Sequence, residues 1–178
     1  MAQMLIDNGA KVKGNVTATK ALAVCCERGD LLGASMLVSA GVEPNLDPQP
    51  LRRPLHHAIH HSRAEMVKLL LSAGSDPNLL CNNVQKTPLL LALESIHNWH
   101  EAREIVDLLI QEGADPNLNH ESTHTPIHEA VSRADEQMVE RLLKAGANPN
   151  TVEKDKLKES ITPVIESLLE SFRQKFSN

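Results

Sequence analysis

Residues 56–61 hold four of the nine histidines, which makes this stretch the one best suited to metal chemistry. His57 and His61 lie four positions apart, so on a helix their imidazoles share one face, one turn apart, and could chelate Zn²⁺. A zinc site needs at least three protein ligands, and no cysteine or carboxylate falls at a matching position. We therefore expect no bound metal and no other cofactor.

The three cysteines could support redox or nucleophilic chemistry, but their pattern argues against both. Cys25 and Cys26 are adjacent and Cys81 is left over, which is unlike a disulfide framework and typical of a reducing compartment. The sequence also has no phosphate-binding glycine loop, no nucleophile elbow and no paired-carboxylate motif. We predict that the protein is not an enzyme.

The elements that position these side chains are predicted to be helices. Only Trp99, Phe172 and Phe176 are aromatic, and there is no tyrosine. A core must then be built from Leu, Ala, Val and Ile, which favours closely packed helices over a β-sandwich or barrel. The 178 residues are enough for one ordinary domain.

Charge and hydropathy exclude several kinds of partner. The net charge is −5, with 18 basic against 23 acidic residues, and no Lys/Arg run offers a surface for nucleic acid. No apolar run approaches the roughly 20 residues of a membrane helix, and residues 1–10 lack the pattern of a signal peptide. We expect a cytoplasmic protein that binds neither nucleic acid nor membrane, unless a leader has been removed from a longer precursor.

A repeated pattern organises most of the chain. A string of the form Gly-x-x-Pro-Asn begins at Gly41, Gly74, Gly113 and Gly146, at intervals of 33, 39 and 33 residues. A second string precedes each copy and begins at Pro54, Thr87 and Thr125, with a degraded version at residues 21–25. Because of this regularity, the fold is expected to be a stack of similar units.

The two strings have the chemistry of a helix start and a helix stop. Threonine caps free N–H groups at a helix N-terminus, and proline fits the first helical turn. Glycine supplies the left-handed residue that closes a helix, and the following Pro-Asn favours a turn. Two short amphipathic runs lie between these signals in each unit, so we predict antiparallel helix pairs that stack to bury their apolar faces.

The second string resembles the Thr-Pro-Leu-His-x-Ala signature of the ankyrin-repeat family, and the 33-residue interval matches the family's period. The resemblance implies an all-α solenoid of helix-turn-helix units with short hairpin-like fingers, forming a single domain over residues 1–178. It predicts a half-repeat at 1–13, full repeats at 14–45, 46–78, 79–117 and 118–150, and a loop with a C-terminal capping helix at 151–178. A partner-binding tail is the alternative interpretation of that last helix, whose apolar stripe holds Val164, Ile165, Leu168, Leu169, Phe172 and Phe176.

Several positions depart from the family pattern or are explained by it. Lys20 and Arg53 replace the capping threonine, so the first two repeats are expected to lack a hydroxyl cap and the N-terminal end to fray first. Cys25 and Cys26 fall where the repeat places small buried residues, and we expect both to be buried. His56 and His128 match the signature histidine, which the resemblance assigns to hydrogen bonding within its turn.

What the resemblance implies for function is binding of another protein through the concave surface formed by the fingers and first helices. The family's exposed recognition positions fall in this sequence on Thr17, Thr19, Glu27, Arg28, Gln49, Arg52, His60, His61, Asn83, Lys86, Glu94, His124 and Arg133. The 39-residue interval comes largely from an insertion at residues 96–100, which contains the only tryptophan. We predict that Trp99 is a binding hot spot; a local core around the lengthened helices is the alternative.

These observations predict a non-enzymatic module, monomeric when unbound, that holds one partner protein and inhibits or sequesters it. An adaptor that links two proteins is the alternative. A third hypothesis, of a different class, is a metal- or pH-responsive sensor built on His60, His61 and His124, because imidazole changes charge near neutral pH.

Overall fold

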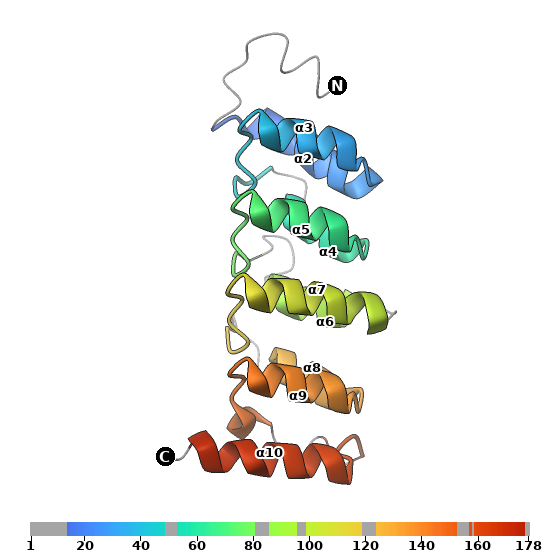
Figure 1. Ribbon diagram of the computed structural model, residues 1–178, viewed down its shortest axis with the longest axis vertical. Helices are drawn as coiled ribbons and strands as arrows, with labels where there is room; N and C mark the ends of the chain where they lie inside the picture. The colour runs from blue at the N-terminus through green and yellow to red at the C-terminus, as the bar shows by residue number, and fades with distance from the viewer. Residues whose placement is uncertain are drawn as a thin grey trace. The chain divides into compact units, whose positions relative to one another are not determined.

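The computed structural model describes residues 14–48, 53–80, 86–95, 99–118, 124–152, 157 and 159–176, without the side chains of Trp99, His100 and Phe176. These residues lie in helices, turns and connecting segments, with no β-strand among them (Figure 1). The predicted all-α class is therefore confirmed. None of the described helices is both long and apolar enough to span a membrane. The expected half-repeat at residues 1–13 and much of each expected finger lie outside the described residues.

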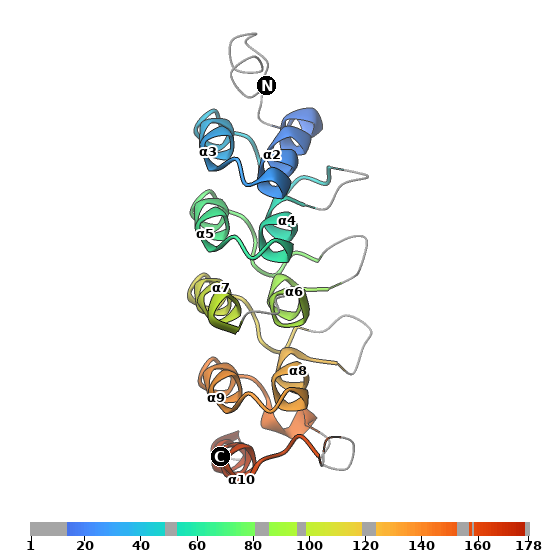
Figure 2. The same cartoon turned by 90° about the vertical axis from the view of Figure 1, so that its right-hand side faces the viewer.

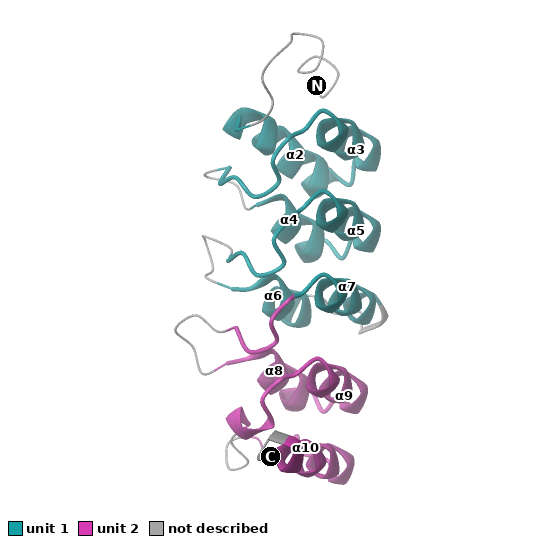
Figure 3. Ribbon diagram, turned by 60° about the vertical axis from the view of Figure 1, so that its left-hand side comes forward, with its two compact units in different colours: residues 1–113 teal, residues 114–178 magenta. Residues whose placement is uncertain are grey.

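The chain divides into two compact units, Met1–Gly113 and Ala114–Asn178 (Figure 3). Unit 1 contains three helix pairs: α2 (Val16–Arg28) with α3 (Leu31–Ser39), α4 (Pro54–His60) with α5 (Ala64–Ser72), and α6 (Pro88–Ser95) with α7 (Trp99–Gln111). Unit 2 contains α8 (Pro126–Ser132), α9 (Glu136–Lys144), the 3-10 turn η1 (Pro149–Thr151) and α10 (Pro163–Phe176). We call α2, α4, α6 and α8 the first helices, and α3, α5, α7 and α9 the second helices.

Within unit 1 the helix pairs stack in two columns (Figure 2). The first helices α2, α4 and α6 pack on one another, and so do the second helices α3, α5 and α7. Between the columns lies an aliphatic core, whose largest fully buried side chains in this unit are Leu22, Leu37, Ile59, Met66, Leu70, Leu89, Leu93, Ile105 and Leu109. No phenylalanine, tyrosine or tryptophan is among the described side chains of this core, as the composition led us to expect.

The helix starts and stops follow the chemistry of the two strings. The hydroxyl of Thr87 accepts a hydrogen bond from the Leu90 N–H at 3.2 Å, which caps α6. Gly41 has a φ of 85°, and its N–H donates to the Val38 carbonyl while the Val42 N–H donates to the Leu37 carbonyl. This pair of bonds is a Schellman motif and closes α3. The glycine stop and the Thr-Pro start are therefore confirmed.

The start of α2 has a cap that the sequence analysis did not predict. Asn15 precedes this helix, and its side-chain oxygen accepts hydrogen bonds from the N–H groups of Thr17 and Ala18 at 2.9 and 3.3 Å. A carboxamide thus replaces the missing hydroxyl, so the first repeat does have a side-chain cap. The second repeat lacks one, as expected, because Arg53 makes no cap bond and donates instead to the main-chain carbonyls of Asn45 and Leu80.

Asparagines of the Pro-Asn turns connect successive repeats. The Asn45 side chain donates to the Gly74 carbonyl at 2.8 Å and accepts from the Asp76 N–H at 2.9 Å. The Asn78 side chain likewise donates to the Gly113 carbonyl at 3.0 Å. In unit 2, Asn117 donates to the Gly146 carbonyl at 2.8 Å and accepts from the Asn148 N–H. We call this series the asparagine ladder.

Replacing Asn45 by alanine is expected to lower the free energy of unfolding by about 1–2 kcal/mol, because the Gly74 carbonyl and the Asp76 N–H each lose a partner. Urea denaturation followed by circular dichroism measures this change. Asn150→Ala is the matched control, since the Asn150 side chain is exposed, and should change stability by less than about 0.5 kcal/mol. Equal losses in the two variants would show that the ladder adds nothing.

In unit 2, α10 packs on α9 and η1. Ile165 and Leu169 are fully buried, whereas Val164 is 49% exposed, so the buried stripe of this helix is narrower than expected. Arg173 of the same helix donates to the carbonyls of Pro149 and Val152 at 3.2 and 3.3 Å. These contacts position α10 as a cover for one side of α9.

Candidate functional site

Six polar residues gather at the C-terminal ends of the first helices in unit 1. Counted from the signature string, Glu27, His60 and Glu94 are equivalent positions, and each is followed by a second polar residue. Because α2, α4 and α6 pack side by side, these ends lie next to one another. We call this set the first-helix row: Glu27, Arg28, His60, His61, Glu94 and Ser95.

The row is accessible and mixed in charge. Glu27, Arg28, His60 and His61 are exposed, and Glu94 and Ser95 are half-buried. A connecting turn must leave each first helix at this point, and turns lie at the surface because their backbone groups need water or other partners. Arg28 also lies in the last turn of α2, where a cation is favoured by the negative end of the helix dipole.

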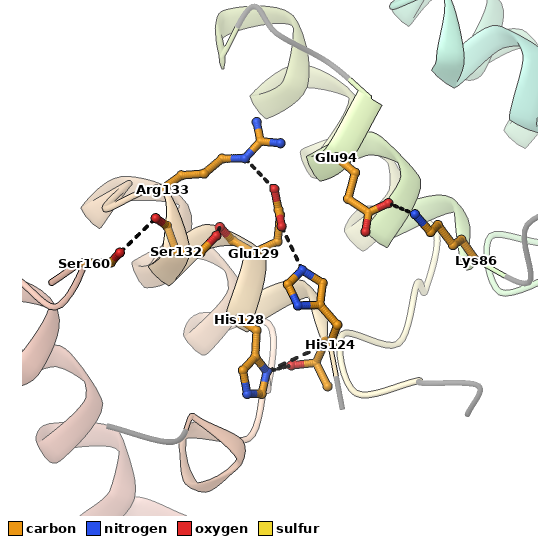
Figure 4. A network of polar contacts seen from close by, with 9 residues as sticks. Lys86, Glu94, His124, His128, Glu129, Ser132, Arg133 and Ser160 are labelled. Carbon is orange, nitrogen blue, oxygen red and sulfur yellow. Dashed lines mark hydrogen bonds and ion pairs between the residues drawn. The ribbon is translucent and has the colours of Figure 1, made fainter. Parts of the chain in front are cut away.

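Two of the expected recognition residues in unit 1 pair with each other. The Lys86 ammonium group, just before α6, forms an ion pair with the Glu94 carboxylate in its last turn (Figure 4). Their side chains are 38% and 22% exposed. A partner protein would therefore meet Lys86 and Glu94 as one joined group.

The two threonines expected at the start of the array differ in exposure. Thr17 is exposed, as a recognition residue should be. Thr19, by contrast, is fully buried, and its hydroxyl donates to the Glu43 carbonyl at 3.0 Å. Since α2 already begins at Val16, Thr19 lies one turn inside the helix and faces inward. The expectation that Thr19 contacts a partner is therefore wrong.

The side chains of four further expected site residues lie outside the described part of the structure. Gln49, Arg52 and Asn83 lie outside the described residues. Trp99 is the first residue of α7, but its side chain is outside the described part. Their roles stay predictions.

The expected recognition residues of unit 2 surround a buried carboxylate. Glu129 of α8 is only 8% exposed, and one of its oxygens lies 2.8 Å from His124 Nε2 (Figure 4). Its other oxygen forms an ion pair with Arg133, one turn further along the chain. His124 and Arg133 therefore both contact the Glu129 carboxylate, in addition to lying at the surface. Glu129 was missed in the sequence, where its signal is a charge at a signature position that holds His57 and Leu91 in other copies.

The signature histidine of α8 does what the resemblance implied. His128 Nδ1 lies 2.6 Å from the Thr125 hydroxyl and 3.4 Å from the Thr125 N–H, which it accepts as a hydrogen bond (Figure 4). This is a capping box with histidine in the position that glutamate usually holds.

The four histidines of residues 56–61 divide into a buried and an exposed pair. His56 and His57 are 1% and 9% exposed, whereas His60 and His61 are exposed. The rings of His57 and His61 are parallel, with centroids 6.4 Å apart, as their spacing of one turn predicts. Among the described residues, no cluster of three or more potential metal ligands includes a histidine of residues 56–61. Two imidazoles alone fall short of the zinc sites found in proteins.

The adjacent cysteines differ in exposure. Cys26 is fully buried, as expected, whereas Cys25 is only half-buried, so that part of the expectation is corrected. Burial raises the pKa of the Cys25 thiol, and the nearby Asp30 carboxylate raises it further. Burial, with a smaller contribution from Cys25, raises the pKa of the Cys26 thiol to about 12. Both thiols are therefore protonated and poorly nucleophilic at neutral pH.

The raised pKa of Cys26 makes stability depend on pH in the alkaline range. The unfolded chain releases this proton near pH 8.5, whereas the folded protein holds it up to about pH 12. The folded state therefore binds more protons between these values, and stability should fall with rising pH by at most about 1.4 kcal/mol per pH unit. Denaturant midpoints measured from pH 8 to 11 should fall more steeply for the natural chain than for Cys26→Ala; parallel profiles would contradict the assignment.

Comparison with known proteins agrees with this architecture. A family model described as ankyrin repeats in three copies matches residues 22–120 and again residues 55–153. The chain is 32% identical over 91 residues to human ankyrin repeat and SOCS box protein 16, which covers 51% of this chain and 20% of that protein. It is 31% identical over 70 residues to the putative ankyrin repeat protein FPV244 of fowlpox virus, which covers 39% of this chain and 10% of that protein.

The chain thus spans a small part of the length of these curated relatives. Ankyrin repeats generally mediate protein–protein interaction and are typically non-enzymatic. The stacked helix pairs, the glycine stops and the match over most of the sequence lead to one conclusion: this chain belongs to the ankyrin-repeat family.

Proposed function

We propose that this protein binds one partner protein through the first-helix row, together with the finger residues Gln49, Arg52 and Asn83, and that it acts by this binding rather than by catalysis. The supporting observation is the alignment of Glu27, His60 and Glu94 at equivalent ends of three packed helices. Each side chain is mounted on a helix whose other face is buried, so the row is held at fixed spacing before any partner arrives.

The chemistry of the row fits a reversible interface. It combines two carboxylates, a guanidinium group, two imidazoles and a hydroxyl, with no large apolar side chain among them. Interfaces between proteins that also exist apart are about as polar as the rest of the surface and are often hydrated. A partner with complementary charges is therefore favoured over a permanently bound, apolar subunit.

Binding of this kind inhibits or sequesters the partner if the row covers the partner's functional surface. An adaptor instead leaves that surface free and holds a second protein elsewhere. Adding the purified module to its identified partner, and measuring the partner's own activity, separates these outcomes. The inhibitor hypothesis predicts that the natural chain lowers the partner's activity and that a row variant leaves that activity unchanged.

Affinity capture from an extract of the source organism, quantified by mass spectrometry, tests the role of the row. The row variant carries Glu27→Ala, His60→Ala and His61→Ala, all at exposed positions. The control variant carries Glu104→Ala and Gln137→Ala, which are exposed on second helices. We expect the captured partner to fall by about tenfold or more with the row variant and to be retained by the control. Retention by the row variant, or equal loss with the control, would overturn the proposal.

The role of Trp99 is tested by a separate variant, Trp99→Ala, in the same capture experiment. If the indole is a hot spot, Trp99→Ala lowers partner capture and leaves the melting temperature unchanged. If it forms a local core beside α7, the same substitution lowers the melting temperature and leaves capture unchanged.

A further inference from the structure

Unit 1 exposes apolar side chains on its second-helix side. Leu31 and Leu32 of α3 are 44% and 73% exposed. The whole of α3 carries no charged residue, in contrast to α5, which presents Glu65 and Lys68 to solvent. Large apolar side chains at this exposure are a feature to be explained when they lie together.

Packing of the repeats does not explain Leu32. Its equivalents, counted back from the turn glycine, are Glu65 in α5 and Glu104 in α7. Glu65 stays exposed although α5 packs against a second helix on either side, α3 and α7. A further repeat packed ahead of α3 would therefore leave Leu32 exposed as well.

A groove lies beside these leucines, between α3 and α5. Its volume is about 360 Å³, and its lining residues are Leu31, Ser35, Glu65, Lys68, Leu69 and Ser72. The lining residues of α5 recur at the spacing of one helix face, so the groove follows the helix axis over two turns, roughly 10 Å. Leu31 and Leu69 supply its apolar surface, and the charged residues lie along the α5 side.

The charges beside the groove select the occupant. Glu65 and Lys68 lie one turn apart on α5, and neither forms an ion pair with another residue that the structure describes. One acid and one base beside an apolar centre have no net charge to attract an acidic or a basic partner. The same arrangement is complementary to itself in a dimer with a two-fold axis, because Glu65 of each copy can then face Lys68 of the other.

We propose that two copies of this chain associate through the groove face of α3 and α5. A two-fold axis crossing both helices between the levels of Glu65 and Lys68 pairs each carboxylate with the ammonium group of the other copy. Since α3 and α5 are related by 33 residues, the same axis places Leu32 at the level of Ser35 of the other copy. This surface lies on the second helices and leaves the first-helix row free, so the proposal does not depend on the proposed function. It differs from the monomer expected from the sequence.

Sedimentation velocity on the purified chain, at about 10 to 1,000 µM, tests the proposal, since a small interface associates weakly. We expect the mass to rise with concentration from 19.5 kDa toward twice that value. Leu32→Glu should keep the chain monomeric across the range. Val164→Glu is the matched control, because Val164 is also exposed, at 49%, but lies in unit 2, and it should associate like the natural chain.

Charge reversal distinguishes this geometry from general apolar adhesion. Glu65→Lys alone and Lys68→Glu alone each bring like charges together, and each should weaken self-association by about tenfold. An equimolar mixture of these two variants should recover association, since one copy then carries two bases and the other two acids. Glu140→Lys, which breaks an exposed pair on α9, is the charge-reversal control. A monomer at every concentration, or a mixture that fails to recover, would overturn the proposal.

Discussion

Leu70→Ala is expected to lower the free energy of unfolding by about 2–5 kcal/mol. Leu70 is fully buried at the centre of unit 1, on α5, between the column of first helices and the neighbouring second helices. Truncation removes three carbon atoms and leaves a cavity that close-packed helices fill only in part. Guanidinium denaturation at low protein concentration measures the loss.

Leu32→Ala is the matched control for that experiment, because the same chemical change is made at a side chain that is 73% exposed. It should alter the free energy of unfolding by less than about 0.5 kcal/mol. If Leu70→Ala cost no more than Leu32→Ala, the stacked core described for unit 1 would be wrong.

Arg133→Met is expected to cost about 3 kcal/mol, because it leaves the Glu129 carboxylate buried without the guanidinium group that pairs with it. The methionine keeps the apolar stem of the side chain, so the loss reports on charge rather than on packing. Glu129→Leu should behave oppositely. It removes the buried charge at a position where α6 already has Leu91, and stability should stay within about 1 kcal/mol of the natural chain or rise.

Combining Glu129→Leu with Arg133→Met should return stability close to that of the natural chain, since the orphaned carboxylate is gone. Lys144→Met is the control: it breaks the Glu140–Lys144 pair, whose side chains are 45% and 66% exposed, and should cost less than about 0.5 kcal/mol. Thermal melts of the four variants provide the comparison. Additive losses in the double variant would show that Glu129 and Arg133 do not act as a pair.

Much of this architecture could be predicted because it depends on backbone chemistry. A left-handed turn demands glycine, and a proline in the first turn of a helix removes no hydrogen bond, so Gly41 and the Thr87–Pro88 pair give helix ends directly from residue type. Aliphatic residues at helical spacing likewise identified the buried faces.

The errors concern side chains whose environment depends on details outside the repeat pattern. Thr19 was expected at the surface because the degraded first copy hides where α2 begins; a cap at Asn15 moves that start and turns Thr19 inward. His124 and Arg133 were expected as independent surface contacts, but a buried acid draws both toward α8. Pairings of this kind depend on side-chain reach across a fold, which periodicity does not encode.

The asparagine ladder has a consequence for how such a chain can change its length. The bond from Asn45 to Gly74 spans 29 residues, whereas the bond from Asn78 to Gly113 spans 35 residues at nearly the same distance. Extra residues in the third repeat, including the insertion at 96–100, therefore leave this connection between repeats intact. Because the ladder joins turn to turn, a repeat can gain or lose residues between its two helices while its neighbours keep their alignment. The turn between the two helices of a repeat is therefore the position at which evolution, or an inserted reporter peptide, can lengthen the chain at least cost to its stability.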